Sequence, residues 1–252
     1  VVSGELGAGR TTTVAALAAL FPQDERVITV EESPEFALPL EHVVSLTLTL
    51  PREFPRPRVP MRAPLTLRDL VRRTWLMRPD RIVLGEVRGE EIYDLLDSVR
   101  CTHASTLTSV SARSPHEAIT RLEQLAQSAV PGMPARDVRE LVGDTVDVVV
   151  HQERLPDGLR CVTSITEVHG MAGDELDVRM IFERDGGQLV ASGTPSFGRL
   201  RHSPPLPTFP ASEPAEPDDA GPVFRWTSQV AARGVNPLLA RGMGSKGFLP
   251  SN

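Results

Sequence analysis

The sequence predicts an α/β fold with a mostly parallel sheet and helices on both of its faces. Short runs of apolar, β-branched residues alternate with helical segments as far as about residue 150, a pattern typical of layered α/β sheets. After about residue 185, prolines among Ser, Glu and Asp dominate, and too few apolar residues remain to offset the entropy of ordering. We therefore expect one folded domain over residues 1–185 and a Pro-rich, largely disordered tail over residues 186–252.

Each element of the first half has its own signal. Val1 and Val2 read as the end of a strand that enters a glycine-rich turn, and residues 11–20 form a helix that is apolar almost all round, so we expect it to be buried. Residues 26–30 are a strand candidate. Residues 43–50 alternate between apolar and polar side chains, as in a strand with one buried face, and a proline-rich loop follows.

The next elements begin with capping signals. Thr66 and Asp69 have the spacing of a capping box, and Ser114 followed by Pro115 is typical of a helix start. The remaining predicted elements are a buried parallel strand over residues 82–84, an amphipathic helix over 92–99, a strand over 106–111, a helix over 134–142, and strands over 146–151 and 161–168 that flank a turn.

The composition narrows the class of protein. It is 40% hydrophobic and 24% charged, as in ordinary globular proteins, and no run of eighteen apolar residues predicts a membrane span. A net charge of −6 argues against a surface devoted to nucleic acid. Cys101 and Cys161 lie outside any C-x-x-C pair, which favours a reducing, cytoplasmic compartment. The chain begins at Val1 without a charged segment, so we expect no signal peptide and leave open whether it is a fragment.

Residues 4–12 have the G-x-x-x-x-G-K-[ST] spacing of a Walker A phosphate loop at a strand-to-helix turn. Backbone N–H groups and the positive helix end would cradle the phosphates of ATP, and the Thr11 hydroxyl would hold Mg²⁺. Arg10 stands where the pattern has lysine, and its planar guanidinium is bulkier than an ammonium group. The alternative is a glycine-rich turn that binds nothing. The predicted binding residues are Gly4, Gly7, Ala8, Gly9, Arg10, Thr11 and Thr12.

Acidic residues end two of the predicted strands. Glu31 and Glu32 follow one strand, and Glu86 follows another. Ligands of parallel sheets sit at the carboxyl ends of the strands, so these side chains are candidates for holding Mg²⁺ and the attacking water.

Residues 77–89, Met-Arg-Pro-Asp-Arg-Ile-Val-Leu-Gly-Glu-Val-Arg-Gly, resemble the Walker B block of the type II/type IV secretion and pilus-assembly ATPases, most closely the CpaF/TadA tight-adherence branch. The same register continues elsewhere. Residues 30–35 resemble the acidic Asp box of this family, residues 102–115 its His box, and residues 162–168 its C-terminal strand. The resemblance covers about residues 1–185, which correspond to the C-terminal ATPase domain of the family.

The resemblance implies a RecA-like P-loop NTPase fold and a cytoplasmic hexameric ring that docks on inner-membrane platform proteins of a pilus or secretion machine. By position, Glu31 would help to activate water, Glu86 would hold the Mg²⁺ shell, and His103 would sense phosphate. A histidine that is merely satisfied at a strand entrance is the alternative for His103. Arg88 is equally well explained as a structural ion-pair partner.

Several family positions are altered. Arg10 replaces lysine, Ser111 replaces the second histidine of the His box, and Thr102 and Ala104 replace its Gly and Asp; residues 45–49 lack the two arginines of the family strand, and the N-terminal domain is absent from this sequence. Two functions follow. The first is an ATPase motor subunit for pilus assembly or secretion; the second is a catalytically weak nucleotide-binding scaffold or remnant. A DNA-directed RecA-like motor fits the phosphate loop but not the Walker B block.

Overall fold

A computed structural model describes residues 1–48, 65–102, 104–185 and 187–193. The predicted proline-rich loop, His103 and all of the predicted tail beyond residue 193 lie outside these residues.

Nine strands of the described residues form one sheet in the order β3-β2-β4-β5-β1-β6-β7-β8-β9. Every neighbouring pair from β3 to β6 is parallel, whereas β6, β7, β8 and β9 pair antiparallel. The predicted α/β fold with a mostly parallel sheet is confirmed. The strands are β1 Val2–Gly4, β2 Val27–Glu31, β3 Val43–Thr47, β4 Arg81–Val87, β5 Ser105–Ser111, β6 Val148–Arg154, β7 Arg160–Ala172, β8 Glu175–Asp185 and β9 Gln188–Ala191.

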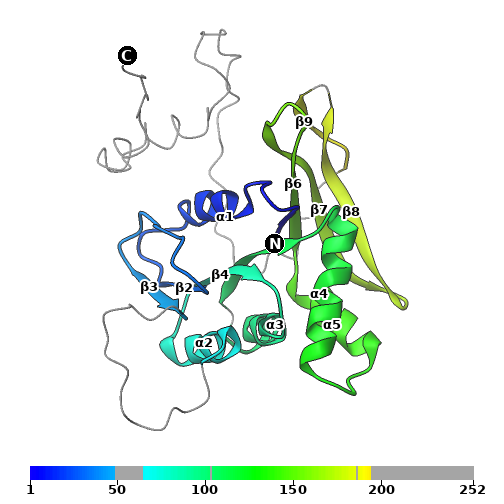
Figure 1. The fold of residues 1–252 in the computed structure, drawn as a ribbon. Coiled ribbons are helices and arrows are strands. Elements are labelled where there is room, and N and C mark those ends of the chain that lie inside the picture. The colour runs from blue at the N-terminus through cyan, green and yellow to red at the C-terminus, as the bar shows by residue number, and fades with distance from the viewer. Residues whose placement is uncertain (49–64, 103, 186, 194–252) are drawn as a thin grey trace, which may run out of the picture. The chain divides into compact units, whose positions relative to one another are not determined.

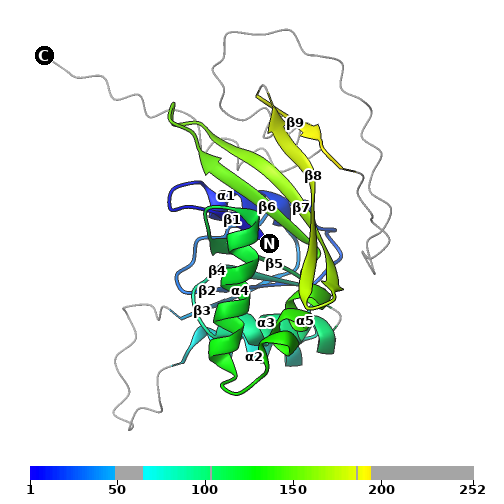
Figure 2. The same ribbon diagram turned by 90° about the vertical axis from the view of Figure 1, so that its right-hand side faces the viewer.

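Helices cover both faces of this sheet, as predicted (Figures 1 and 2). One face packs against α1, Arg10–Ala18, through Val14 and Ala18. The other face carries the larger core, built with α2 Leu67–Thr74, α3 Glu91–Thr102, α4 Pro115–Ala129 and α5 Ala135–Thr145, and a short 3₁₀ helix, Trp75–Met77, follows α2.

The prediction that the first helix is buried on all sides was wrong. The buried residues of α1 are Arg10, Val14 and Ala18, which lie on one face, while Thr11 and Thr12 are exposed. The helix packs on the sheet with its inner face, and Ala15 and Ala16 occupy a partly exposed outer face.

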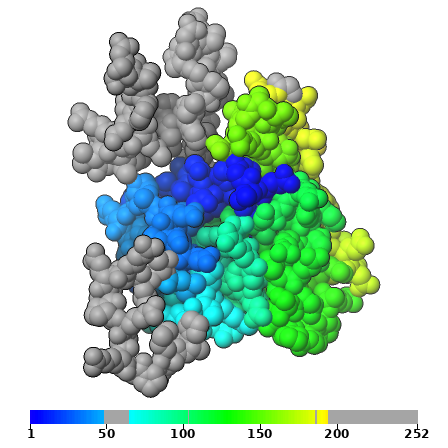
Figure 3. Space-filling model, viewed as in Figure 1, coloured from blue at the N-terminus to red at the C-terminus, as the bar shows by residue number. Residues whose placement is uncertain are grey.

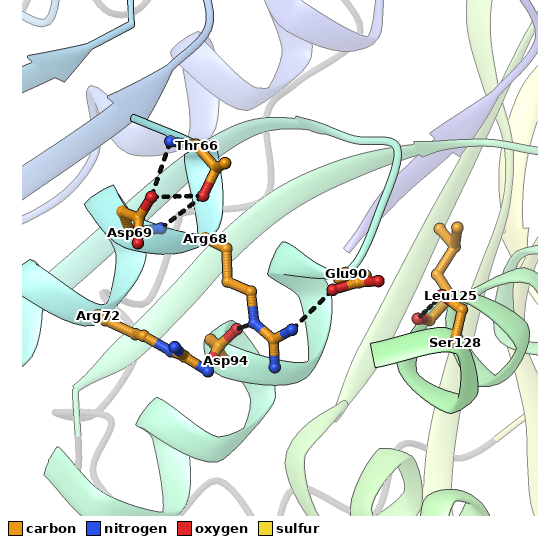
Figure 4. A network of polar contacts seen from close by, with 8 residues as sticks. All are labelled: Thr66, Arg68, Asp69, Arg72, Glu90, Asp94, Leu125 and Ser128. Atoms are coloured by element: carbon orange, nitrogen blue, oxygen red, sulfur yellow. Dashed lines mark hydrogen bonds and ion pairs between the residues drawn. The ribbon is translucent and has the colours of Figure 1, made fainter. Parts of the chain in front are cut away.

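The two predicted helix starts are confirmed. Thr66 and Asp69 form a complete capping box at the start of α2, as Figure 4 shows. Ser114 accepts a hydrogen bond from the N–H of Glu117, and Pro115 occupies the first turn of α4. These contacts satisfy backbone donors that the first turn of a helix leaves without partners.

The antiparallel part of the sheet extends further than the sequence predicts. β7 runs four residues past the expected end at residue 168, and β8 was not predicted at all. Alternating apolar positions at Leu176, Val178 and Met180 are the signal for β8. β9 pairs with β8 beyond residue 185, so residues 188–191 form a strand and do not belong to a disordered tail.

No described helix combines the length and the apolar character needed to cross a membrane.

Candidate functional site

The glycine-rich loop connects the carboxyl end of β1 to the first turn of α1. Gly7 and Gly9 have φ angles of 80° and 94°, in the left-handed region that glycine adopts without strain. A Cβ atom on Gly4 would lie 2.4 Å from the carbonyl oxygen of Gln152, so no larger residue fits there. The loop therefore depends on its glycines for both backbone conformation and close packing. Figure 3 shows the N-terminal segment, in blue, at the molecular surface.

The N-terminus of α1 has unused hydrogen-bond donors. No side chain caps the helix, and the N–H groups of Arg10, Thr11 and Thr12 have no hydrogen-bond partner within the described ranges. The side chains of Thr11 and Thr12 are exposed. Unpaired N–H groups together with the positive helix end attract anions, so this turn has the chemistry of a phosphate site.

Arg10 connects the loop to the predicted Walker B strand. Its side chain is 8% exposed, and its Nη2 donates to Glu86 Oε1 at 2.8 Å. Its Nη1 is buried and has no hydrogen-bond partner among the described residues. A buried donor without a partner is costly, so a ligand that accepted a hydrogen bond from Nη1 would gain from an interaction that the protein leaves unmade.

Glu86 is held on both sides by arginines. The register of β4 against β5 shifts between Val83 and Glu86, and such irregularities redirect side chains near functional sites. Glu86 Oε2 accepts from Arg88 Nη2 at 2.8 Å, and Arg88 also lies 3.5 Å from Glu32. Burial disfavours the charged carboxylate, but Arg88 and Arg10 outweigh burial and place the pKa of Glu86 below its ordinary value. Arg10, Glu32, Glu86 and Arg88 are called the loop cluster below.

Glu31 ends β2 beside the same strand. Its Oε1 accepts from the N–H groups of Glu35 and Phe36 at 2.8 and 2.9 Å, and its Oε2 is buried without a partner in the described part of the chain. A Cβ on Gly85 would lie 4.0 Å from Glu31 Cγ, so Glu31 packs next to the residue that precedes Glu86.

The structure brings most of the predicted site residues to one edge of the sheet. Arg10 contacts Glu86, Thr11 follows Arg10 in the first turn of α1, and Glu31 lies against β4. Ser111, which replaces a family histidine, pairs with Gly4 and thus lies beside the loop. Arg88 forms an ion pair with Glu86, which is the structural role that the sequence analysis considered for it. His103 lies outside the described residues.

Sequence reasoning missed two residues that contact the loop. Gln152 donates to the carbonyl of Ala8, and Arg160 donates to the carbonyl of Gly7. The neighbouring polar residues His151 and Gln152, placed after three valines, interrupt an apolar strand and are the sequence signal for at least Gln152.

Oxygen ligands suited to Mg²⁺ are present in the site. Mg²⁺ prefers hydroxyl, carboxylate and phosphate oxygens, and Thr11 and Glu86 offer the first two next to Arg10. Both Glu86 oxygens are already paired with arginines, so a cation there competes with Arg10 and Arg88. The described residues contain no group of three His, Cys, Asp or Glu side chains that could hold a metal ion.

Comparisons with known proteins show the family to which the chain is similar. Residues 1–179 match the family described as "Type II/IV secretion system protein". A putative conjugal transfer protein of Mycobacterium tuberculosis is 35% identical over 173 residues, which are 69% of this chain and 47% of that protein. The type IV secretion system protein VirB11 of Brucella suis is 37% identical over 153 residues, 60% of this chain and 41% of that protein.

A solved structure gives the same result. The crystal structure of the VirB11 ATPase from the Brucella suis type IV secretion system, in complex with sulphate, is 34% identical with a TM-score of 0.56, and the match covers 65% of this chain and 46% of that one. The RecA-like fold predicted from the sequence is thereby confirmed. The chain spans less than half the length of each of these relatives.

Proposed function

The chain belongs to the type II/IV secretion system protein family, and on that premise we propose that it binds ATP and hydrolyses it slowly as a motor subunit. The observation that carries this proposal is the buried Arg10 with a free Nη1, next to the unpaired N–H groups that open α1. Two kinds of donor therefore converge on one turn, backbone N–H groups and a guanidinium, and the positive helix end adds favourable charge. A triphosphate offers acceptors for both kinds of donor.

The acidic residues supply the other half of the proposed chemistry. Glu31, with one buried oxygen free of hydrogen bonds in the described chain, would orient the attacking water. Thr11 and Glu86 would hold Mg²⁺, which when bound neutralises charge on the phosphates. His103 would sense phosphate, by its place in the His box. In this proposal the residues of the chain bind the phosphates and orient the attacking water. Arg88 and Arg10 keep Glu86, the carboxylate that would hold the cation, in its ionised form.

A specific observation favours a second function, that of a weak or inactive nucleotide-binding scaffold. Arg10 is engaged by Glu86, so the residue that stands for the Walker A lysine is shared between the phosphate loop and the Walker B strand. Ser111 beside Gly4 cannot supply the charge of a histidine. Loss of one transition-state donor costs about 10²–10³ in rate, and this chain lacks more than one.

The intact protein is proposed to form a homo-hexameric ring with nucleotide between subunits, in the cytoplasm and peripheral to the inner membrane. Its proposed partners are the platform proteins of a pilus or secretion machine, and its proposed branch is the CpaF/TadA tight-adherence branch, whose Walker B block residues 77–89 resemble. These statements rest on family membership and on the sequence blocks. Sedimentation of the full gene product with an ATP analogue tests the ring, and a monomer at every concentration would contradict it.

ATP affinity and steady-state phosphate release of the native chain, Arg10→Lys and Glu86→Gln test the function itself. We expect slow native turnover and an ATP affinity about tenfold higher in Arg10→Lys, roughly 1.4 kcal/mol, because an ammonium fits between phosphates where a planar fork does not. Glu86→Gln should lose turnover by about 10²-fold or more. Native turnover without an effect of Glu86→Gln would refute the site, and binding without any turnover would favour the scaffold.

A further inference from the structure

Two side chains from the antiparallel part of the sheet hold the glycine-rich loop by its carbonyl groups. Gln152, on β6, donates from Nε2 to the carbonyl of Ala8. Arg160, the first residue of β7, donates from Nε to the carbonyl of Gly7 at 2.7 Å. Both residues lie more than 140 positions away from the loop in the sequence, and neither belongs to the phosphate-loop motif.

Gln152 lies at an irregular point of β6. The register between β6 and β7 shifts between His151 and Gln152. Successive side chains of a strand point to opposite faces, and His151 and Gln152 are 2% and 3% exposed, so both faces of β6 are covered at this point. His151 is buried against Ser3 and Gln152 against Ala8.

The packing of the loop against these residues is close. A Cβ atom on Gly9 would lie 3.1 Å from Arg160 Cδ and 3.3 Å from Gln152 Nε2. The loop backbone therefore lies directly against the two side chains, and Gly9 is needed for that approach as well as for its positive φ.

These contacts determine which loop donors stay free. The carbonyl of Ala8 is the acceptor that the N–H of Thr12 would use if α1 continued one turn earlier, since helical bonds run from residue i to residue i−4. Gln152 occupies that carbonyl instead. In a planar trans peptide the C=O and the following N–H point in opposite directions, so holding the Ala8 carbonyl also aims the N–H of Gly9 away from Gln152.

Arg160 adds positive charge at the loop. Its side chain is exposed, and its Nη1 and Nη2 atoms make no hydrogen bond or ion pair with any residue in the part of the chain described. The guanidinium of Arg10, in contrast, is paired with Glu86. Within the described part of the chain, no carboxylate therefore neutralises the charge of Arg160 at this loop.

We propose that Gln152 and Arg160 are positioning residues that hold the glycine-rich loop in the conformation that binds phosphate, and that Arg160 also supplies positive charge to the bound nucleotide. This inference rests on the proposed function, since it names the residues that prepare that same site. Preorganised donors are worth more than flexible ones because they need no ordering when the ligand binds.

The experiment measures ATP affinity of the full chain by calorimetry in four variants. Gln152→Glu replaces the donor with an acceptor of the same shape, and we expect at least tenfold weaker binding. Arg160→Gln should weaken binding about tenfold, whereas Arg160→Lys keeps the charge and should recover part of the loss at low salt. Arg154→Gln is the matched control. Arg154 pairs with Arg160 across the hairpin, is exposed and forms no hydrogen bond or ion pair with residues 4–9, so the ATP affinity of this variant should stay within twofold of the native value.

Amide hydrogen exchange of residues 5–12 without nucleotide provides an independent readout. We expect faster exchange of these amides in Gln152→Glu and Arg160→Gln, with unchanged exchange in the core of the sheet. Native exchange and native affinity in both variants would overturn the inference, as would faster exchange throughout the chain, which would indicate general destabilisation. If the native chain binds no ATP while the loop amides still respond, the proposed function fails and the positioning of the loop stands.

Discussion

The loop cluster and a second group of charged residues at α2 and α3 both place a carboxylate between two arginines. They differ in whether a buried donor is left without a hydrogen-bond partner. The second group, called the helix cluster, consists of Arg68, Arg72, Glu90 and Asp94. The side chain of Asp94 is 3% exposed. Its two oxygens accept from Arg68 Nε at 2.5 Å and from Arg72 Nε at 2.6 Å, and Arg68 also contacts Glu90 at 2.7 Å (Figure 4). No buried polar atom of this cluster lacks a partner among the described residues.

The loop cluster also contains two arginines and two carboxylates, but one of its buried hydrogen-bond donors has no partner among the described residues. The oxygens of Glu86 are paired, while the Nη1 of the buried Arg10 is not, and unpaired N–H groups open the helix beside it. Two arginines around a carboxylate therefore do not indicate a function by themselves. A buried donor that the fold positions beside other unpaired donors is a candidate ligand contact, because leaving it without an acceptor is costly.

The largest effect is expected from Asp94→Asn in the helix cluster. Removing the charge leaves two arginines around a buried neutral group, and breaking a buried ion pair costs about 3–5 kcal/mol. Arg68 and Arg72 are 23% and 51% exposed, so solvent screens part of the loss, and we expect the free energy of unfolding to fall by about 2–3 kcal/mol. Urea denaturation followed by circular dichroism measures this.

Asp97→Asn, three residues along the same helix, is the control for Asp94→Asn. Asp97 makes no ion pair with the described residues, so its substitution should change the free energy of unfolding by less than about 0.5 kcal/mol. Equal effects of the two substitutions would show that the helix cluster does not act as a saturated structural network.

A double-mutant cycle on Arg10 and Glu86 measures the corresponding pair in the loop cluster. Glu86→Gln leaves the buried guanidinium of Arg10 without its counter-charge, and we expect a loss of about 1–2 kcal/mol, less than in the helix cluster because Glu86 is 23% exposed. Adding Arg10→Met should restore part of this loss, because it removes both the uncompensated charge and the unpaired Nη1. Additive effects of the two substitutions would show that the pair is not coupled.

The sequence predicted the parallel half of the fold and the position of the loop because these depend on local signals. Hydrophobic runs, capping residues and glycine spacing are local signals. β1, β2 and β5 lie within two residues of where they were expected, and β4 extends three residues past its expected end. The convergence of Arg10, Glu31 and Glu86 followed from the rule that parallel strands end at one edge.

The contacts that control the loop could not be predicted in this way. The pairing of Arg10 with Glu86 depends on side-chain reach across two strands. The two polar residues at 151 and 152 mark Gln152 in the sequence, but its contact with Ala8 joins residues that are 144 positions apart. Arg160 follows a turn and reads as an ordinary exposed residue of a hairpin. Long-range geometry determines all three, and periodicity carries no information on it.

The smallest expected effect concerns His151, which lies on β6 opposite Ser3 of β1, the strand that leads into the loop. Its Nδ1 is 2.9 Å from Ser3 Oγ, and burial lowers its pKa below the ordinary value of about 6.5, although Glu153 opposes the shift. Because the folded chain binds this proton less readily than the unfolded chain, the stabilisation is complete above pH 6.5 and is lost as the pH falls through the depressed pKa. We expect the free energy of unfolding to fall as the pH falls through this window, and His151→Gln to remove that part of the pH dependence. His116→Gln, at an exposed position of α4, should leave the pH dependence as in the native chain. A native pH profile in His151→Gln would show that His151 is protonated equally in the folded and unfolded chains.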